Sequence, residues 1–237
     1  MLMRLLFGCL FSAATVLAGD VLTLREGEKG HCEDVTLDYQ LRPDDRLKHN
    51  FGAAPTLVVY CSGGKNLSLE NGEVLRNDDG WRKLALLRFD LSWVPREKIR
   101  SIRLVLHVLG RAKRIPHEFE LRRLLRDDLQ FGSGVDAVEE GSVSAACRRT
   151  PTEGWGRGDE VMPRAGKDFD TQAFAHATLE EGATTLVFDL PPDDLEWAKG
   201  FVIYPTTRSQ EGGGYVIFAS SEHPQANLRP ALEIHYQ

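Results

Sequence analysis

The chain has 237 residues, of which 42% are hydrophobic and 27% are charged, and its formal net charge is −6 at pH 7. This hydrophobic fraction is large enough for a packed core, and the charge is too evenly spread for a disordered chain. The negative net charge argues against a nucleic-acid ligand, because binding to phosphates requires clustered Lys and Arg side chains on a positive face.

The first residues have the pattern of a secretory signal peptide. Arg4 precedes an apolar run that ends in a small-residue cleavage site at Ala18. We therefore expect residues 1–18 to be removed and the protein to be secreted, whether to the periplasm, the cell surface or the medium. A lipoprotein acylated at Cys9 is the alternative, but its apolar segment would be too short for export. No later segment is apolar enough to predict a membrane span.

Residues 19–237 are expected to form a single domain, because all-β domains of this length are common. The mature chain would keep Cys32, Cys61 and Cys147, an odd number that allows at most one internal disulfide. Cys32 with Cys61 is the preferred pair, since it would tie the first strand to the next. The remaining thiol is expected to be buried and inert.

Strand patterns recur at short intervals and are separated by Gly, Pro, Asn and Asp. In the clearest one, Ile102, Leu104 and Leu106 alternate with more polar residues and predict one buried face. The ten candidate strands are residues 35–41, 56–60, 83–91, 101–109, 118–125, 142–148, 184–190, 201–204, 215–220 and 231–236.

Helical periodicity is scarce, and residues 171–179 and 193–198 are the two candidates for short helices. Many short strands without alternating helices indicate an all-β sandwich or barrel. Periodicity alone does not separate a jelly roll from an immunoglobulin-like sandwich. Residues 62–81 form a long Gly-rich and Asn-rich connection, interpreted as a variable loop, with a glycosylation sequon at Asn66.

Four motifs in order resemble the DNRLRE domain family, which overlaps carbohydrate-binding module family 96. They are Asn50-Phe51-Gly52 with the strand that follows, the strand ending at Asp90-Leu91-Ser92, Gly166-Lys167-Asp168-Phe169-Asp170, and the ending from Phe218 to Tyr236. The resemblance runs from about Asp34 to Tyr236. It implies a two-sheet antiparallel β-sandwich of jelly-roll type and a non-catalytic carbohydrate-binding function.

The resemblance also implies structural roles for several residues. Trp197 is expected in the core, Glu222 is expected to pair with Arg229 or to accept loop N–H groups, and Asp90 is expected to be structural. Trp93 is expected to cover an edge of the sandwich. The chain departs from the family at residues 128–132, where many members carry a Trp and this chain has Leu129 or Phe131. It departs again near Cys147, where members often carry an aromatic residue, so its ligand contacts are expected to differ or to be absent.

A carbohydrate ligand would stack on aromatic rings and hydrogen-bond to polar side chains. We expect Trp155 either to be pinned under its glycine-rich loop or to be displayed, and we expect Trp81 to form an exposed platform. Basic side chains on strands would favour uronic-acid chains. The candidate binding residues are Trp81, Arg82, Arg103, His107, Lys113, Arg122 and Trp155.

Asp168 and Asp170 lie two residues apart, so an extended segment would direct both carboxylates to one side. Such a pair can contribute to a structural calcium site, but calcium needs about six to eight oxygen ligands at once. No other cofactor is expected. No Gly-x-Ser-x-Gly motif or other catalytic arrangement is present in the sequence, so we do not expect an enzyme.

Three hypotheses follow. The first is a secreted module that binds a polysaccharide, and the second is a structural or adhesive surface domain with a protein partner. A polysaccharide lyase or hydrolase is third, because it lacks a recognisable set of catalytic residues.

Overall fold

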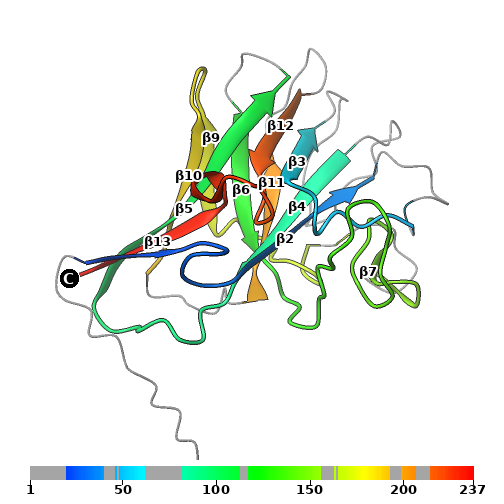
Figure 1. The fold of residues 1–237 in the computed structure, drawn as a ribbon, viewed down its shortest axis with the longest axis horizontal. Helices are drawn as coiled ribbons and strands as arrows, with labels where there is room; N and C mark the ends of the chain where they lie inside the picture. Colours follow the sequence, from blue (N-terminus) through cyan, green and yellow to red (C-terminus); the bar gives the residue numbers. More distant parts are fainter. Residues whose placement is uncertain are drawn as a thin grey trace, which may run out of the picture.

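A computed structural model shows a fold that is nearly all β, built around a large, curled antiparallel sheet (Figure 1). The structure describes residues 20–39, 46, 48–61, 82–112, 117–155, 163, 165–192, 199–206 and 214–237. The signal peptide, the loop at residues 62–81 and the candidate helix at residues 193–198 lie outside these ranges.

Eleven strands form the large sheet, and β7 pairs only with β8. In chain order they are β1 (Val21–Leu24), β2 (Cys32–Asp38), β3 (Thr56–Cys61), β4 (Arg82–Phe89), β5 (Ile99–Arg111), β6 (His117–Arg123), β7 (Cys147–Arg149), β8 (Glu153–Gly154), β9 (Ala175–Leu179), β10 (Thr185–Leu190), β11 (Phe201–Pro205), β12 (Gly214–Ala219) and β13 (Ala231–Tyr236). A turn of 3-10 helix, η3 (Ala226–Leu228), precedes β13.

The long strand β5 explains how the sheet curls. Its first part pairs with β13 on one side and β10 on the other, and its last part pairs with β12. From β12 the order continues through β3, β4, β11 and β6 to β9, which contacts β10. The sheet therefore bends back on itself around an enclosed apolar interior.

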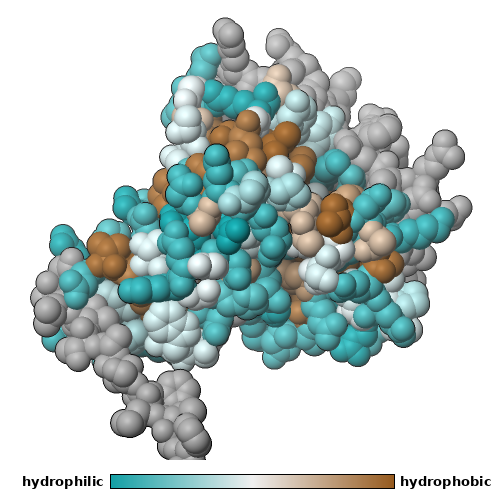
Figure 2. All heavy atoms as spheres, in the orientation of Figure 1, coloured by the Kyte–Doolittle hydropathy of each residue, from teal (hydrophilic) through white to brown (hydrophobic). Residues whose placement is uncertain are grey.

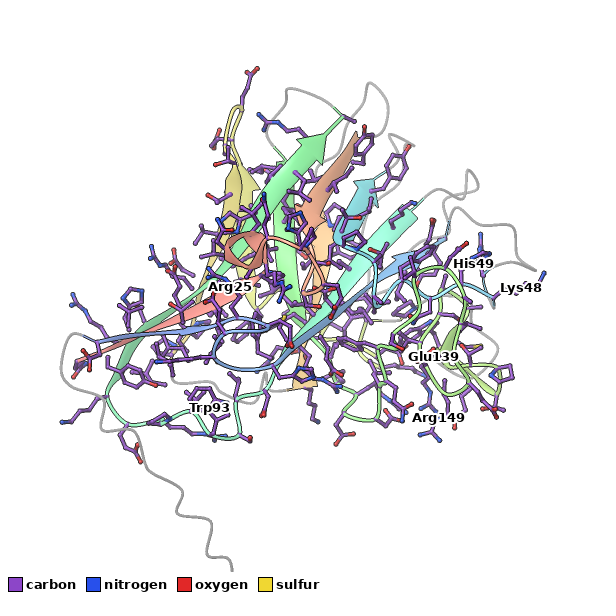
Figure 3. The ribbon with its side chains drawn as sticks, viewed as in Figure 1. Arg25, Lys48, His49, Trp93, Glu139 and Arg149 are labelled. Atoms are coloured by element: carbon purple, nitrogen blue, oxygen red, sulfur yellow. The ribbon has the colours of Figure 1, made fainter. Side chains whose placement is uncertain are left out.

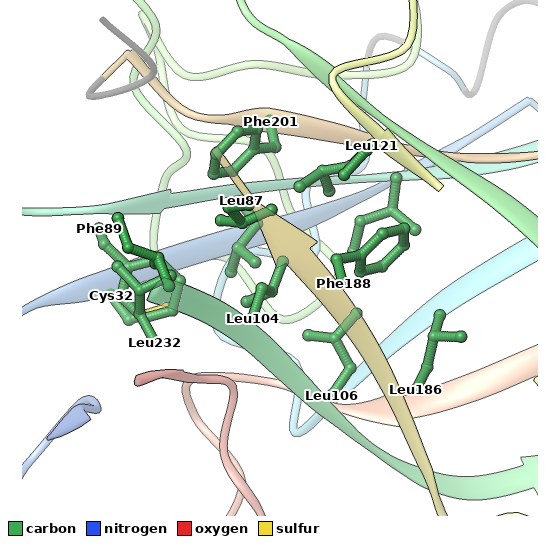
Figure 4. Packing of buried hydrophobic residues seen from close by; sticks show 14 of the residues in the cluster. Cys32, Leu87, Phe89, Leu104, Leu106, Leu121, Leu186, Phe188, Phe201 and Leu232 are labelled. Carbon is green, nitrogen blue, oxygen red and sulfur yellow. The ribbon is translucent and has the colours of Figure 1, made fainter. Parts of the chain in front are cut away.

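That interior, which we call the inner core, is filled by alternating residues of the strands around it (Figure 4). In this cluster, Leu104 and Leu106 of β5 lie beside the neighbouring strand β10, where Phe188 is the register partner of Leu104, and Leu87 of β4 belongs to the same cluster. In β13, Leu232, Ile234 and Tyr236 are buried, as their alternation predicts. The two-residue period of the sequence thus correctly identified the face that packs inward.

The other face of β4 is also buried, in a second cluster that we call the outer core. Ala85 and Leu87 belong to the inner core, whereas Leu84 and Leu86 belong to the outer core. Residues 124–155 and 165–169, the covering segment, supply the opposite side of the outer core. Figure 1 shows much of this segment as the green loops around β7. Residues 84–87 of β4 are therefore covered by protein on both faces.

Asn50 fastens the covering segment to the sheet. Its buried Nδ2 donates to the main-chain oxygens of Phe131 and Val143, both at 2.7 Å, and its Oδ1 accepts the N–H of Gly52 at 2.9 Å. A Cβ on Gly52 would lie 2.1 Å from the carbonyl oxygen of Gly132, so only glycine permits this close approach. The Asn50-Phe51-Gly52 motif is thus a structural clamp.

Two predicted elements are wrong. Residues 171–179 are not a helix: Ala175 and Leu179 are buried, His176 and Thr178 are less so, and the segment pairs with β6 as strand β9. Hydrogen bonding to the edge of β6 favours a strand here more strongly than the weak helical periodicity of the sequence favours a helix. Residues 142–148 are mostly loop, because Asn50 and neighbouring main-chain groups bind them, and only Cys147–Arg149 forms a strand.

The remaining nine strand predictions are confirmed within a few residues at each end, but β1, β8 and β9 were missed. Of the residues that the structure describes, none belongs to a helix that is long and apolar enough to cross a membrane.

Candidate functional site

The basic residues predicted to form one binding face lie on opposite sides of the protein. Arg103 and His107 alternate along β5 with Leu104 and Leu106, which point into the inner core. Arg122 follows Leu121 of β6, which points into the same core from the other side. These three side chains therefore point away from the inner core in different directions, and one ligand cannot contact them all.

Arg122 is a structural residue. Only 3% of it is exposed, and its guanidinium binds the Glu120 carboxylate at 2.5 Å and the main-chain oxygen of Thr171 at 2.7 Å. It also lies over the ring of Tyr204, 5.4 Å from the centroid. All of its donor groups face protein, so its predicted contact with a ligand is wrong.

Arg103 and His107 are also poor ligands for an anion. Arg103 binds Glu233 on β13 at 2.7 Å, and its partner in the register on β10 is the acidic residue Asp189. Burial lowers the pKa of His107, and the nearby Arg25 lowers it further. The row of charges on this face is therefore already neutralised by the protein.

Trp155 is fully buried and its indole N–H donates to the main-chain oxygen of Ser144 at 3.0 Å. Of the two alternatives, the pinned position is correct and the displayed one is wrong. Trp81, Lys113, Trp197 and the side chain of Arg82 lie outside the described part of the chain, so these four assignments stay predictions.

Asp168 and Asp170 do not form the expected pair of carboxylates. Asp168 lies in a turn after Gly166, whose φ is +78°, and is buried, whereas Asp170 binds Arg123 at 2.6 Å. The segment is not extended, so the side-chain alternation on which the pair depended does not apply. In the described residues, no group of three or more His, Cys, Asp or Glu side chains is placed to hold a metal ion.

The predicted pairing of Glu222 with Arg229 does not form. The guanidinium of Arg229 instead donates to the main-chain oxygens of His223 at 2.7 Å and Glu26 at 3.0 Å. Arg229 is structural as expected, but it joins the loop before β13 to the loop after β1 through main-chain atoms.

The predicted disulfide between Cys32 and Cys61 is also wrong. Cys32 pairs in the register with Phe89 at one end of β4, and Cys61 pairs with Arg82 at the other. Seven residues of strand separate two points by about 23 Å, whereas a disulfide requires Cα atoms within about 7 Å. The thiol of Cys32 is free and buried in the inner core.

We expect the Cys32 thiol to resist alkylation in the native protein and to react after unfolding. Burial is the main reason that its pKa is raised, with Asp34 the next contributor, so little reactive thiolate forms. Iodoacetamide labelling without reductant, followed by peptide mass mapping, should find Cys32 modified only in denaturant. A peptide linking Cys32 to Cys61 would contradict the strand registers.

A pocket lies where β2 begins and β4 ends, on the side of the protein away from the covering segment's β7 hairpin. Its volume is about 340 Å³. Phe89 and Leu91 are buried at its base, and charged side chains surround them. The lining residues are His31, Glu33, Arg88, Phe89, Asp90, Leu91, Ser92 and Arg96.

One wall of this pocket is a fixed chain of polar contacts. Arg88 binds Glu33 through Nε at 3.0 Å and Nη2 at 2.5 Å, and its guanidinium lies over the Phe131 ring, 4.9 Å from the centroid. His31 contacts Glu26 through Nδ1 at 2.8 Å and lies 3.7 Å from Glu33 through Nε2. These contacts hold the wall in one arrangement before any ligand binds.

The opposite wall is the loop after β4. The Oδ1 of Asp90 accepts the main-chain N–H of Ser92 at 2.9 Å, and the N–H and side chain of Ser92 lower the pKa of Asp90. Asp90 is therefore ionised at neutral pH and acts as an acceptor, which extends the structural role expected for it. Arg96 is exposed and has no ion pair with a residue in the described ranges.

Trp93 lies on the same loop, between Ser92 and Arg96 (Figure 3). It is 44% exposed, so much of the indole is open to a ligand, which differs from the edge-covering role expected for it. In Figure 2, which has the same orientation, most of the coloured surface around the position of Trp93 is hydrophilic. Sequence alone offered one signal here, a Trp within a short loop that also carries Asp, Ser and Arg.

No family model matches this chain, and no curated protein matches it. The pocket offers the fixed guanidinium of Arg88, the ionised carboxylate of Asp90, the hydroxyl of Ser92 and the guanidinium of Arg96, which has no ion pair with a described residue, around an apolar base. The exposed Trp93 directly follows Ser92 in the chain. This combination binds small polar molecules that have both hydroxyl groups and C–H faces.

Proposed function

We propose that the protein is a non-catalytic, secreted carbohydrate-binding domain and that the pocket beside Trp93 is its ligand site. The observation that carries this proposal is a pocket lined with fixed hydrogen-bonding groups, whose lining residue Ser92 is followed directly in the chain by the exposed Trp93. A sugar ring stacks its C–H face on an indole, while its hydroxyls bind carboxylates and guanidinium groups at the ring edge.

The proposed ligand is an acidic polysaccharide. Arg96 on the rim, and Lys98 and Arg100 further along the chain, are exposed and form no ion pair with a described residue. These cations would bind the carboxylates of a uronic-acid chain. In this proposal they take the ligand-binding role that was expected of Arg103 and Arg122, which form ion pairs with Glu233 and Glu120.

The volume of the pocket favours a ligand of about one or two sugar residues rather than a long groove-bound chain. Because both faces of β4 are covered, further sugar residues would have to extend outwards over Trp93. Affinity should therefore stop rising with chain length after the first few residues.

We propose that the domain is not an enzyme. Glu33 is held by Arg88 and His31 by Glu26, so these two groups of the pocket are already engaged with protein side chains. The proposed fold is a jelly-roll-like sandwich of the DNRLRE type, supported by the passage of β5 from the strands around β13 to those around β12.

The experiment that tests this function is a glycan array that includes neutral and acidic polysaccharides, run with and without calcium. We expect binding to a defined acidic glycan. A blank array from protein shown to be folded would contradict the proposal, and turnover of a bound glycan would instead indicate a lyase or hydrolase.

We expect Trp93→Ala and Asp90→Ala each to weaken binding of the selected glycan about tenfold or more, because each removes an anchor of the ligand. Isothermal titration calorimetry measures this effect. Tyr215→Ala is the matched control, since Tyr215 is 41% exposed on β12, away from the pocket. A loss of affinity in the control alone would place the site elsewhere.

A structural or adhesive role with a protein partner is the second candidate. An apolar area lies over β5 and β12 (Figure 2), where Leu109 and Tyr215 are exposed. Such an area is typical of a protein interface when it is extended. Loss of self-association or partner binding in Leu109→Ser, with an unchanged glycan array, would favour this candidate.

A further inference from the structure

Asp34 of β2 is a carboxylic acid buried at the joint between three segments. Only 1% of it is exposed. Its Oδ2 accepts the main-chain N–H of Ser221 at 2.5 Å, in the turn after β12, whereas its Oδ1 has no hydrogen-bond partner within the described structure. The N–H and the hydroxyl of Ser221 are poor compensation for a buried negative charge, because both donors are neutral.

The ionisable groups that act on Asp34 increase this cost. Glu222 approaches from the turn after β12, and Glu26 approaches from the loop after β1. The thiol of Cys32, on the same strand, has a raised pKa and is neutral. None of these groups is a cation. Burial is the main cause that raises the pKa of Asp34, to about 8; Glu222 and Glu26 raise it further, and Ser221 opposes the rise.

Asp34 thus differs from the other acids on and around β2, which have cations. Glu33 binds Arg88 and Asp38 binds Lys83. Because alternate residues face opposite sides of a strand, Asp34 points away from Glu33, and Asp38, which shares its face four residues further on, has Lys83 as its own cation. Asp34 points to the turn at residues 220–222, whose other attachments include the hydrogen bond from the Ser220 hydroxyl to the Ala54 oxygen.

We propose that Asp34 is a proton-controlled latch: its neutral carboxyl holds the turn at residues 220–222 against β2, and its ionisation releases that turn. The proton sits on Oδ1, because Oδ2 is the acceptor for Ser221. When the proton is lost, repulsion from Glu222 and Glu26 and the demand of the charge for water both favour opening. This inference does not depend on the proposed function.

The direction of the pH effect follows from the proton count. The folded protein keeps this proton up to about pH 8, whereas an unfolded Asp loses it near 3.8. Between these values the folded state binds one more proton, so the unfolding equilibrium constant rises by up to tenfold for each pH unit. The contribution of the neutral acid to stability is complete below the lower value and is lost as the pH approaches the higher one.

The latch also adjoins the proposed ligand site. Glu26, which acts on Asp34, accepts the main-chain N–H of Cys32 at 2.7 Å and contacts His31 of the pocket at 2.8 Å. Opening of the turn would therefore disturb the loop that carries one pocket wall.

The test is urea unfolding between pH 5 and 9 for the full chain, Asp34→Asn and Asp127→Asn. Asn has the same shape as a neutral Asp, so we expect Asp34→Asn to lose a large part of the decline in stability with pH and to unfold at higher urea at pH 8. Asp127 is exposed and serves as the control, which should keep the decline. Equal pH slopes in all three proteins would overturn the proposal.

Carboxyl NMR of the unmodified chain gives a second measurement if Asp34→Asn does not fold. We expect the Asp34 carboxyl to titrate near pH 8, with the amide signals of residues 220–222 changing at the same midpoint. A midpoint below about pH 5, or turn signals that do not follow the titration, would show that Asp34 is not a latch.

Discussion

Asn50→Asp should destabilise the protein by about 3–5 kcal/mol, because the substitution turns two buried hydrogen bonds into repulsive contacts. The Nδ2 of Asn50 donates to the carbonyl oxygens of Phe131 and Val143, and a carboxylate at this position would have no proton to donate. Chemical denaturation followed by tryptophan fluorescence measures the loss.

The effect should extend to the pocket, because Phe131 joins the two sites. Its main-chain oxygen is held by Asn50, and its ring lies under the guanidinium of Arg88. Asn227→Asp is the matched control, since Asn227 is exposed on η3, and it should change stability by less than about 0.5 kcal/mol. A change below about 1 kcal/mol for Asn50→Asp would contradict the clamp.

Arg122→Gln should cost about 3–5 kcal/mol, because it leaves Glu120 and two carbonyl oxygens in a buried site without their cation. Arg122 binds Glu120 and the main-chain oxygens of Asp170 and Thr171. It therefore ties β6 to the segment before β9. Urea unfolding at neutral pH gives the comparison.

Arg103→Gln is the contrasting variant on the opposite face. Arg103 pairs with Glu233 at the surface, and such exposed ion pairs contribute less than about 1 kcal/mol. Similar losses in the two variants would show that Arg122 is not the buried structural residue described above. Neither variant should abolish glycan binding at the pocket if the protein is folded.

Much of the fold was predictable from local pattern. The alternation of Ile102, Leu104 and Leu106, and of Leu232, Ile234 and Tyr236, identifies the inward face because strands direct alternate residues to opposite sides. The same rule failed for residues 142–148. Their polar groups are bound by Asn50, which is distant in sequence, so nothing local indicates a loop there.

The candidate site was mostly not predictable, for a physical reason. Sequence shows which side chains are basic or aromatic, but burial and pairing decide whether they are free. Arg122 and Trp155 are residue types that bind sugars. However, the guanidinium of Arg122 is paired with Glu120, and the indole N–H of Trp155 donates to the Ser144 oxygen. Arg96 and Trp93 are available because they lie on an exposed loop, and the pocket beside them forms only when β2 and β4 pair.

NMR mapping of backbone amides during titration with a bound oligosaccharide tests the location of the ligand site most directly. We expect the changes to concentrate at His31, Glu33 and residues 88–96, and to be absent around Tyr215. Changes confined to the strands around β12, with no change in the amide signals of the pocket residues, would contradict this location.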